Sequence, residues 1–551
     1  MSLFILFKSI TKREWVIIFV AWLITITASL IPFLFSKVWL QQGYVISGVQ
    51  ALNYLDIHYF YSLIIQIKEG AFFVDNLYSI STFSFLQLRP SWLLVGWWAS
   101  IWHLTPVVAF YSFKVIATLF LLVVIYIFLK LFFDQFVWRI IAFFNVIFTM
   151  GFGFWLIVLL QTIAPHSALL YNNWPLDIGA PEAFIFLSIL ASPHLVISWT
   201  LLIGIYLLWF LFIQENITQH QRFIYGLSIG ILTAILFIDH PYHILPVSLI
   251  IGLHVLWLFF YKKQLFHKLI ESLLIIILLA AGGIFYHLFL MNFDWLTRVK
   301  ILQNNVVTPA WWVILVSYGF FILGAIWQIK KYVLEKNIDV KHIFLIIWFF
   351  VHLVLILIPS FLQRRFIQGW QLPLVILSFF YFQNLYKKIQ ADNRKKLIFI
   401  FILLVIFLLP SPLYSVARNI IYYRANTPHT YIYYSPEMYA AYQELLKPQY
   451  FQSVLLAHPV NANFIPGVTG RRVIAGHWSE SVYFDSTAKL VELFFQTNIP
   501  AEHKKMWLKE LGITHIFYSE YEKSLGNFDL NSTNFLELVY ENQGVKIYKI
   551  K

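Results

Sequence analysis

Long apolar segments separated by short polar connections dominate residues 1–415 of the chain. The apolar segments recur at lengths near ~20 residues, which is the length an α-helix needs to cross ~30 Å of hydrocarbon. The first of them, Trp15–Phe35, is too long for the core of a cleaved signal peptide and is expected to remain as a span. We therefore predict about eleven transmembrane helices, at residues 15–35, 106–130, 139–160, 191–213, 223–239, 242–261, 269–291, 310–328, 343–359, 371–386 and 397–415.

Residues 36–105 form a long loop between the first two predicted spans. Within it, the apolar segment Trp92–Leu104 is too short for a crossing, so we expect it to be re-entrant or to lie in the membrane interface. Four apolar residues at helical spacing predict an amphipathic juxtamembrane helix that lies along the membrane surface: Phe60, Ile64, Ile67 and Ala71.

The pattern changes to mixed polar and apolar residues over 416–551, which predicts a small α/β domain outside the membrane. Strands are expected in SVLLAHPV, RRVIAG and THIFYS, and helices in STAKLVELFFQT and AEHKKMWLKEL. The final segment LELVYENQGVKIYKI predicts a hairpin that turns at Asn542-Gln543-Gly544. The fold class is therefore an α-helical polytopic membrane protein, residues 1–415, with a C-terminal α/β domain, residues 416–551.

Composition and charge support the membrane assignment. The chain is 60% hydrophobic and only 12% charged, well below the charged fraction of a soluble domain. Its net charge of +13 comes from short basic clusters between apolar segments, which is the positive-inside pattern and argues against nucleic-acid binding. The clusters fall on one side when the N-terminus is cytoplasmic and the C-terminal domain extracytoplasmic, except for Arg364-Arg365 and the weaker pair Arg298 and Lys300. The absence of cysteine excludes disulfides and thiolate chemistry.

Asp56 and His58 lie at the start of the predicted juxtamembrane helix. Asp56 can simply cap that helix. Alternatively, its carboxylate is a general base that takes a proton from an acceptor hydroxyl.

Two further predicted outer loops carry ionisable residues close to the membrane boundary, where such groups usually face a cavity or a partner. The loop after the third span offers His166, Asp177, Glu182 and His194. Asp177 is expected to be mostly solvated, and structural pairing is the alternative role for the others. The next turn, FIDHPYHILPV, carries Asp239, His240, Tyr242 and His243, whose spacing matches no specific metal motif.

The adjacent arginines Arg364 and Arg365, flanked by Gln363 and Gln368, run against the positive-inside pattern. Guanidinium groups bind phosphate oxygens bidentately, so a lipid-linked phosphate is the preferred ligand. Contact with lipid headgroups, or a salt bridge to Asp56 or Glu182, is the alternative. Lys114, within the second span, is either another cation of the same cavity or a snorkelling side chain.

The C-terminal segment ANFIPGVTGRRVIAGHWSESVYF carries Arg471, Arg472, His477 and Glu480. Its glycine spacing does not match a P-loop. We expect a loop that folds over the membrane cavity and contacts donor or acceptor, with a purely structural turn as the alternative.

These segments resemble the GT-C superfamily of polytopic glycosyltransferases. The resemblance lies in the large first outer loop with DIHYFYSLIIQIKEGAFFVDNLYS and RPSWLLVGWWASIWHL, and in DHPYHILP, QRRFIQGWQLPL and IPGVTGRRVIAGHWSE. It implies a polyprenyl-phosphate sugar donor and a catalytic acid in the first outer loop, at Asp56. Members often carry a second acidic residue next to the first or one position further on, whereas Ile57 and His58 stand there in this chain. A divalent metal ion is therefore left open as a cofactor.

The implied activity is transfer of a sugar from a polyprenyl-phosphate carrier to an extracytoplasmic lipid, glycan or protein acceptor. Two alternatives use similar residues. A transporter or flippase of lipid-linked glycans is expected to show inverted repeats, and none stands out. A non-catalytic scaffold that binds envelope glycans needs no reactive carboxylate.

Overall fold

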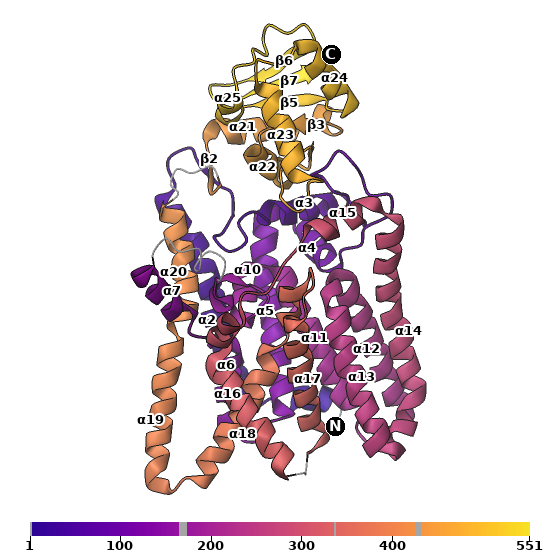
Figure 1. Ribbon diagram of the computed structural model, residues 1–551, viewed down its shortest axis with the longest axis vertical. Helices are drawn as coiled ribbons and strands as arrows, with labels where there is room; N and C mark the ends of the chain where they lie inside the picture. The colour runs from indigo at the N-terminus through magenta and orange to yellow at the C-terminus, as the bar shows by residue number, and fades with distance from the viewer. Residues whose placement is uncertain (1–2, 165–173, 336–337, 426–430) are drawn as a thin grey trace. The chain divides into compact units, whose positions relative to one another are not determined.

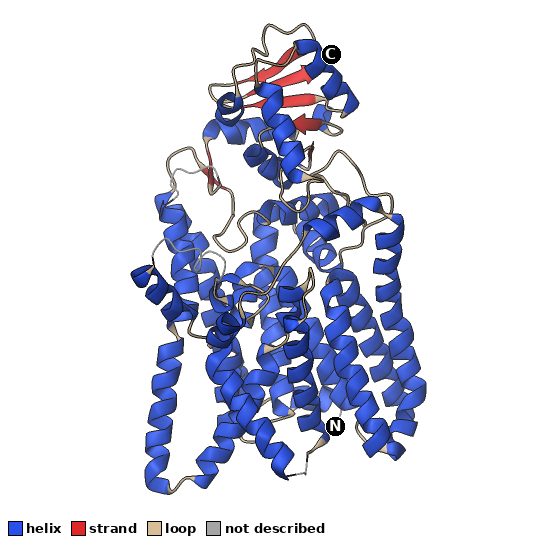
Figure 2. Ribbon diagram, viewed as in Figure 1, coloured by secondary structure: helices blue, strands red, loops and turns tan. Residues whose placement is uncertain are grey.

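We describe the protein from a computed structural model, which describes residues 3–164, 174–335, 338–425 and 431–551. The chain divides into two compact units, each made of three stretches of sequence. Unit 1 comprises Met1–Ile31, Lys114–His287 and Val306–Arg418, and unit 2 comprises Pro32–Phe113, Leu288–Asn305 and Asn419–Lys551. Figure 1 shows the elements in chain order, and Figure 2 shows that helices dominate.

Nine helical segments of the described chain are long and apolar enough to cross a membrane, or ten if the bent pair α6 and α7 forms one span. The protein is therefore a multi-pass membrane protein. Its candidate spans are α2 (Lys12–Ser36) with η1 (Lys37–Trp39), α5 (Pro106–Lys130), α6 (Phe136–Phe148) with α7 (Gly153–Ile163), α11 (Pro193–Phe212), α12 (Gln219–Asp239), η2 (Pro241–His243) with α13 (Ile244–Tyr261), α14 (Lys263–Phe293), α16 (Trp311–Glu335), α17 (Val340–Leu357), and α19 (Ala391–Leu408) with α20 (Pro410–Ala425).

These helices agree closely with the predicted spans, with three differences. The segment predicted as one span at 139–160 is divided into the bent pair α6 and α7. The segment predicted as a span at 371–386 forms α18 (Gln371–Lys388), which is not among the candidate spans of the described residues. The last span is longer than predicted, because the helical segment continues to Arg424. The short segment after Arg89 forms α4 (Pro90–Ile101), whose 12 residues are too few for a crossing.

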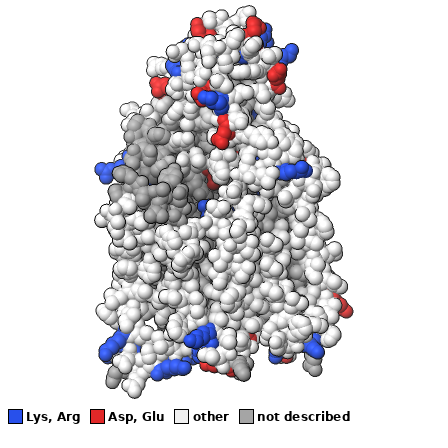
Figure 3. All heavy atoms as spheres, viewed as in Figure 1, with Lys and Arg blue, Asp and Glu red and all other residues white. Residues whose placement is uncertain are grey.

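Shorter elements complete the membrane part of the chain. They are α1 (Leu3–Lys8), α9 (Leu176–Gly179), α10 (Ile185–Ala191) and η3 (Gln363–Ile367). On the face shown in Figure 3, basic side chains gather at the lower end, where Figure 1 places the junction of α18 and α19. That junction carries Lys387 and Lys388 at the end of α18 and Arg394-Lys395-Lys396 in α19. This clustering is the pattern from which a cytoplasmic N-terminus was predicted, and the orientation stays a prediction.

Two helix irregularities in unit 1 satisfy each other. The break between α6 and α7 leaves Phe152 N–H free to donate to Val316 O at 3.0 Å, next to the kink of α16 at Gly319. Gly151 is required there, because a Cβ at that position would lie 2.0 Å from Ser317 O. Non-helical backbone in a membrane protein needs such internal partners.

The first outer loop and the start of the C-terminal region belong together in unit 2. Strand β1 (Val45–Ile46) pairs antiparallel with β2 (Tyr433–Tyr434), a contact the sequence pattern did not reveal. Helix α3 (Ile57–Lys68) packs against α4 and against α22 (Pro459–Thr469). Helix α15 (Trp295–Gln303) joins the same unit.

The C-terminal region is a mixed sheet with helices on both faces. Its strand order is β4-β3-β5-β7-β6, with β3 parallel to β4 and β5, and β7 antiparallel to β5 and β6. The strands are β3 (Val454–Leu456), β4 (Arg472–Val473), β5 (His515–Tyr518), β6 (Leu536–Glu541) and β7 (Lys546–Ile550), and the helices are α21 (Pro436–Leu445), η4 (Pro448–Tyr450), α22, α23 (Phe484–Phe495), α24 (Ala501–Glu510) and α25 (Glu520–Leu525).

Alternation along the strands builds two cores. Leu455 and Phe517 face the core with α21 and α22, whereas their neighbours Leu456 and Ile516 face the core with α23 and α24. The three strands, two helices and final hairpin expected from sequence are confirmed. The first part of the segment that was expected to be a loop, from Ala462, is helical instead: α22 extends to Thr469 and ends at Gly470, whose φ of 72° suits glycine.

Candidate functional site

Asp56 lies at the N-cap of α3 in unit 2, but its side chain does not cap the helix. Instead, its Oδ1 lies 3.0 Å from Nε2 of His477. The Asp56 side chain is 31% exposed, whereas that of His477 is 1% exposed. The carboxylate is thus accessible and anchored by a buried imidazole, and the capping alternative is wrong.

Helix α3 is more enclosed than an amphipathic surface helix. Phe60, Ile64 and Ile67 are buried as their spacing predicted, and the remaining face is also largely buried in unit 2, where α4 and α22 pack against the helix. A firmly held helix fixes the backbone position of Asp56.

An ion pair joins the loop that carries His477 to α15. Nζ of Lys300 pairs with Oε2 of Glu480 and lies 5.7 Å from the ring centroid of Tyr59. Burial lowers the pKa of Lys300, and Glu480 opposes that shift. Burial, together with Glu480, raises the pKa of Tyr59. Lys300 is one of the basic residues that depart from the positive-inside pattern. Its pairing with the carboxylate of Glu480 explains why a basic residue occurs at this position.

Arg472 fastens the same loop to the first outer loop. Its guanidinium pairs with Asp75 and donates to the carbonyl oxygens of Asn76 (2.7 Å) and Ser79 (2.8 Å). The Asn76 amide in turn donates to Glu480 O at 2.7 Å. Arg472 therefore holds protein groups around Asp56 and His477.

Two other predicted residues of unit 2 lie in packed interior. His58 is fully buried beside Tyr434 and Phe464, and its Nε2 is hydrogen-bonded to the Tyr434 hydroxyl. Burial lowers the pKa of His58 to about 3, so the imidazole is neutral. Arg471 is 3% exposed and donates to Leu445 O at 2.9 Å, with its guanidinium over the Phe451 ring.

Most of the predicted residues of unit 1 form one polar cluster. Nε of Arg364 donates to Oε1 of Glu182 at 3.0 Å, and the guanidinium of Arg365 lies 5.8 Å from the ring centroid of Tyr242. Burial raises the pKa of Glu182, but the charges of Arg364 and Arg365, together with hydrogen bonds to the carboxylate, lower it overall. The salt bridge to Glu182, one of the alternatives for the twin arginines, is therefore present for Arg364.

Histidines and amides extend this cluster behind Tyr242. The Tyr242 hydroxyl donates to Oε1 of Gln368 at 2.6 Å, and its oxygen also lies 3.2 Å from Nδ1 of His240. Nε2 of His240 lies 3.4 Å from Oδ2 of Asp239, and the His240 ring stacks on that of His194 with 5.4 Å between centroids. The structure thus brings eight predicted residues into one chain of contacts: Glu182, His194, Asp239, His240, Tyr242, Arg364, Arg365 and Gln368.

Several predicted residues lie outside this chain of contacts. Gln363 bonds the Thr308 N–H and Ile356 O, which fixes the backbone around η3. Lys114 is fully buried in α5 and donates to Leu190 O at 3.1 Å. His166 lies outside the described residues.

Asp177 is fully buried, so the expectation that it is mostly solvated is wrong. Its Oδ2 accepts hydrogen bonds from Gly153 N–H (2.9 Å) and the Ser411 hydroxyl (2.8 Å). Burial raises the pKa of the Asp177 carboxyl to about 6. The hydrogen bonds favour the charged form and make this rise smaller.

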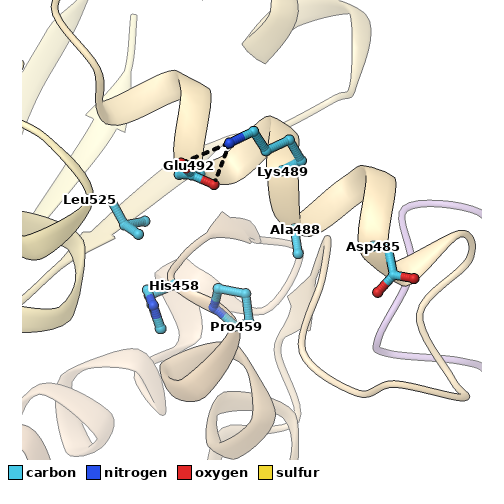
Figure 4. Close-up of a pocket in the computed structure, with 7 residues that line it drawn as sticks. All are labelled: His458, Pro459, Asp485, Ala488, Lys489, Glu492 and Leu525. Atoms are coloured by element: carbon cyan, nitrogen blue, oxygen red, sulfur yellow. Dashed lines mark hydrogen bonds and ion pairs between the residues drawn. The ribbon is translucent and has the colours of Figure 1, made fainter.

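Two features bear on ligand chemistry. Among the residues that the structure describes, no three His, Asp or Glu side chains come together as a metal site. A pocket of about 300 Å³ in unit 2 lies between the start of α22, α23 and the end of α25 (Figure 4). An ion pair of Lys489 and Glu492 at 2.8 Å borders it, and none of the residues predicted from sequence lines it.

Comparison with known proteins shows the fold. No protein-family model and no curated protein matches the chain. The apo crystal structure of the oligosaccharyltransferase of Archaeoglobus fulgidus superposes with a TM-score of 0.56 at 12% identity, over 98% of this chain and 75% of that one. A crystal structure of that enzyme tethered by a disulfide to an acceptor peptide with the NVT sequon gives 0.50 at 11% identity, over 90% and 69%. The chain therefore has an oligosaccharyltransferase-like fold.

Proposed function

We propose that the protein is a membrane glycosyltransferase that moves a sugar from a polyprenyl-phosphate-linked donor to an extracytoplasmic acceptor. The observation that carries the proposal is the accessible Asp56 carboxylate held by His477 at 3.0 Å, within a fold like that of an oligosaccharyltransferase. Sequence resemblance to the GT-C superfamily, which puts its catalytic acid in the first outer loop, agrees with this position.

The proposed reaction assigns separate tasks to the two units. Asp56 accepts the proton of the acceptor hydroxyl while the hydroxyl oxygen bonds to C1 of the sugar. The bond between C1 and the phosphate oxygen breaks, and its electron pair leaves on the phosphate. Arg364 and Arg365 stabilise that developing negative charge, because cations at a leaving group lower the barrier.

The other cluster residues have supporting roles in the proposal. Tyr242, His240 and Gln368 are connected by hydrogen bonds, and such a network can hold the donor phosphate and sugar in one orientation. Asp239, His194 and Glu182 border them within the cluster, whereas Lys114 is placed within the second span. Asp56 belongs to unit 2 and the twin arginines belong to unit 1. Their convergence in one cavity is a prediction of the proposed reaction.

The test uses the full chain in lipid nanodiscs with a polyprenyl-phosphate-linked ¹⁴C-hexose as the probe. Release of polyprenyl phosphate measures cleavage of the donor, and mass spectrometry of surface glycans with and without the protein identifies the product. Asp56→Asn is expected to reduce turnover by about 10²- to 10⁴-fold while the donor still binds. Glu69→Gln, at the exposed other end of α3, is the matched control and should retain wild-type turnover.

The outcomes separate the alternatives. Wild-type turnover in Asp56→Asn removes this residue from the mechanism. Movement of intact lipid-linked sugar across the bilayer, without cleavage, identifies a flippase. Binding of envelope glycan with neither cleavage nor movement identifies a scaffold.

A further inference from the structure

The ring of His477 is hydrogen-bonded at both nitrogens, and the bonds at the two nitrogens differ in direction. Nδ1 accepts from the backbone N–H groups of Ser479 (3.3 Å) and Glu480 (3.2 Å). A nitrogen that accepts from N–H groups presents its lone pair, so the ring proton of the neutral imidazole lies on Nε2. Nε2 therefore donates to Oδ1 of Asp56.

The surroundings hold this ring in place. The Ser481 hydroxyl oxygen accepts from Gly476 N–H (2.9 Å) and His477 N–H (3.1 Å), which closes the loop around the imidazole. The rings of Tyr59 and Tyr78 lie 5.8 and 5.7 Å from the His477 ring. The side chain is 1% exposed, so reorienting it requires the loop to open.

Asp56 Oδ2 carries no hydrogen bond within the described part of the chain. One oxygen of the carboxylate is thus held by an oriented N–H, and the partly exposed side chain keeps the other oxygen available to an incoming hydroxyl.

We propose that His477 is a positioning residue for Asp56: the loop amides of Ser479 and Glu480 fix the Nε2–H tautomer, and this N–H fixes the orientation of the base. The inference rests on the proposed function for the role of Asp56. It assigns the loop between β4 and α23 to alignment of the reacting groups.

Two substitutions each retain the hydrogen bonding of one ring nitrogen and lose that of the other. The Asn carbonyl oxygen of His477→Asn lies near the place of Nδ1, so it can accept from the loop amides but cannot reach Asp56. The amide nitrogen of His477→Gln lies near the place of Nε2, so it can donate to Asp56. A role confined to loop structure predicts that Asn is the better substitute, whereas positioning predicts that Gln is.

Kinetics on the full chain in nanodiscs, with the polyprenyl-phosphate-linked ¹⁴C-hexose, separate these roles. His477→Asn is expected to lower kcat by about 10- to 100-fold with an unchanged KM for the donor, as for other supporting residues that orient a reactive group. His477→Gln is expected to restore kcat to within about threefold of wild type by the same reasoning. His503→Asn, on the exposed side of α24, is the matched control and should have wild-type kcat.

Nitrogen NMR of ¹⁵N-histidine-labelled protein tests the tautomer without any turnover. The signal pair lost in His477→Asn is expected to show a protonated Nε2 and an unprotonated, hydrogen-bonded Nδ1, and the Nε2–H signal is expected to shift in Asp56→Asn.

The results distinguish the inference from the proposed function. Absent turnover in the wild-type chain contradicts the glycosyltransferase, while the tautomer is still decided by NMR. Normal turnover in His477→Asn, equal losses in the Asn and Gln variants, or a protonated Nδ1 would each overturn the positioning role and leave the glycosyltransferase standing.

Discussion

Nε of Arg364 lies 3.0 Å from Oε1 of Glu182, so one of the two arginines expected to bind phosphate already has a carboxylate partner. The Glu182 side chain is 10% exposed and that of Arg364 is 34% exposed. The buried carboxylate thus holds a guanidinium that still reaches solvent. A phosphate at this guanidinium competes with Glu182 for the same donors.

Glu182→Gln is expected to tighten phosphate binding, because it removes the competing charge and leaves Arg364 in place. We expect farnesyl phosphate, a soluble polyprenyl phosphate, to bind about 2- to 10-fold more tightly, a difference of roughly 0.4–1.4 kcal/mol. Tryptophan fluorescence titration of the full chain measures the affinity.

The controls for this prediction remove positive charge instead. Arg364→Gln and Arg365→Gln should weaken binding, whereas Lys331→Gln, which breaks the pair with Glu335 in α16, should not change it. Weaker binding in Glu182→Gln would show that the carboxylate orients the arginine for phosphate rather than competing with it.

Local patterns account for what the sequence predicted well. Apolar length located the spans, and the short apolar run in THIFYS located β5, whose successive side chains are buried in two different cores. Helix α22 was not predicted from the sequence. Pro466 and Gly467 indicate a loop by their local preferences, whereas packing against α3 holds them in a helix.

Nothing local selects one distant carboxylate over another: Asp56 and Glu182 stood as alternative partners of the twin arginines, and no partner was named for Lys300. The sequence marked Lys300 and Arg364 as basic residues on the wrong side of the charge pattern, and the structure pairs them with Glu480 and Glu182. The expectation that Asp177 is solvated was wrong, because the break between α6 and α7 gives its carboxylate a buried hydrogen-bond donor, Gly153 N–H, that no local pattern indicates.

Gly467→Ala is expected to displace α22 from α3. A Cβ at this position would lie 2.5 Å from His58 O and 2.9 Å from His58 Cα, and backbone atoms cannot rotate away. We expect a loss of about 1–3 kcal/mol in stability, typical of overpacking, together with reduced turnover because α3 carries Asp56 at its start. Thermal denaturation and the donor-cleavage assay measure the two effects.

Gly282→Ala in α14 is the matched control. A Cβ there meets no atom within 4 Å, so the substitution should be neutral or stabilise the helix by up to ~1 kcal/mol. Equal thermal midpoints for Gly467→Ala and wild type would contradict the tight contact of α22 with α3.

Asp177 is expected to make the protein less stable as pH rises. Burial raises its pKa from 3.8 to about 6, so between these values the folded chain binds more protons at this site than the unfolded chain. Its contribution therefore falls with rising pH, by roughly 2–2.5 kcal/mol between pH 4 and 7. Asp177→Asn removes the titration. The thermal midpoint of this variant, minus that of wild type, should increase from pH 4 to pH 7, and a constant difference would contradict the prediction.

The proposed reaction predicts that Asp56 and the twin arginines face the same cavity, and the lack of cysteine makes this testable with site-specific labels. Tyr54 and Phe361 are exposed neighbours of the two groups, at 38% and 40%. Spin labels on cysteines at these positions should lie within about 25 Å of each other, because a base and a phosphate must contact one sugar. Pulsed electron paramagnetic resonance measures the distance.

A third label, at Lys387, supplies the reference. Lys387 lies in the last turn of α18, whose 18 residues extend about 27 Å from the end that follows η3. The distance from Phe361 to Lys387 should therefore be about 25–30 Å, and Tyr54 should be nearer to Phe361 than to Lys387. A Tyr54 label nearer to Lys387 would put Asp56 at the wrong end of unit 1. The arginines could not then receive the phosphate released by a reaction at Asp56, and the proposed mechanism would have to be abandoned.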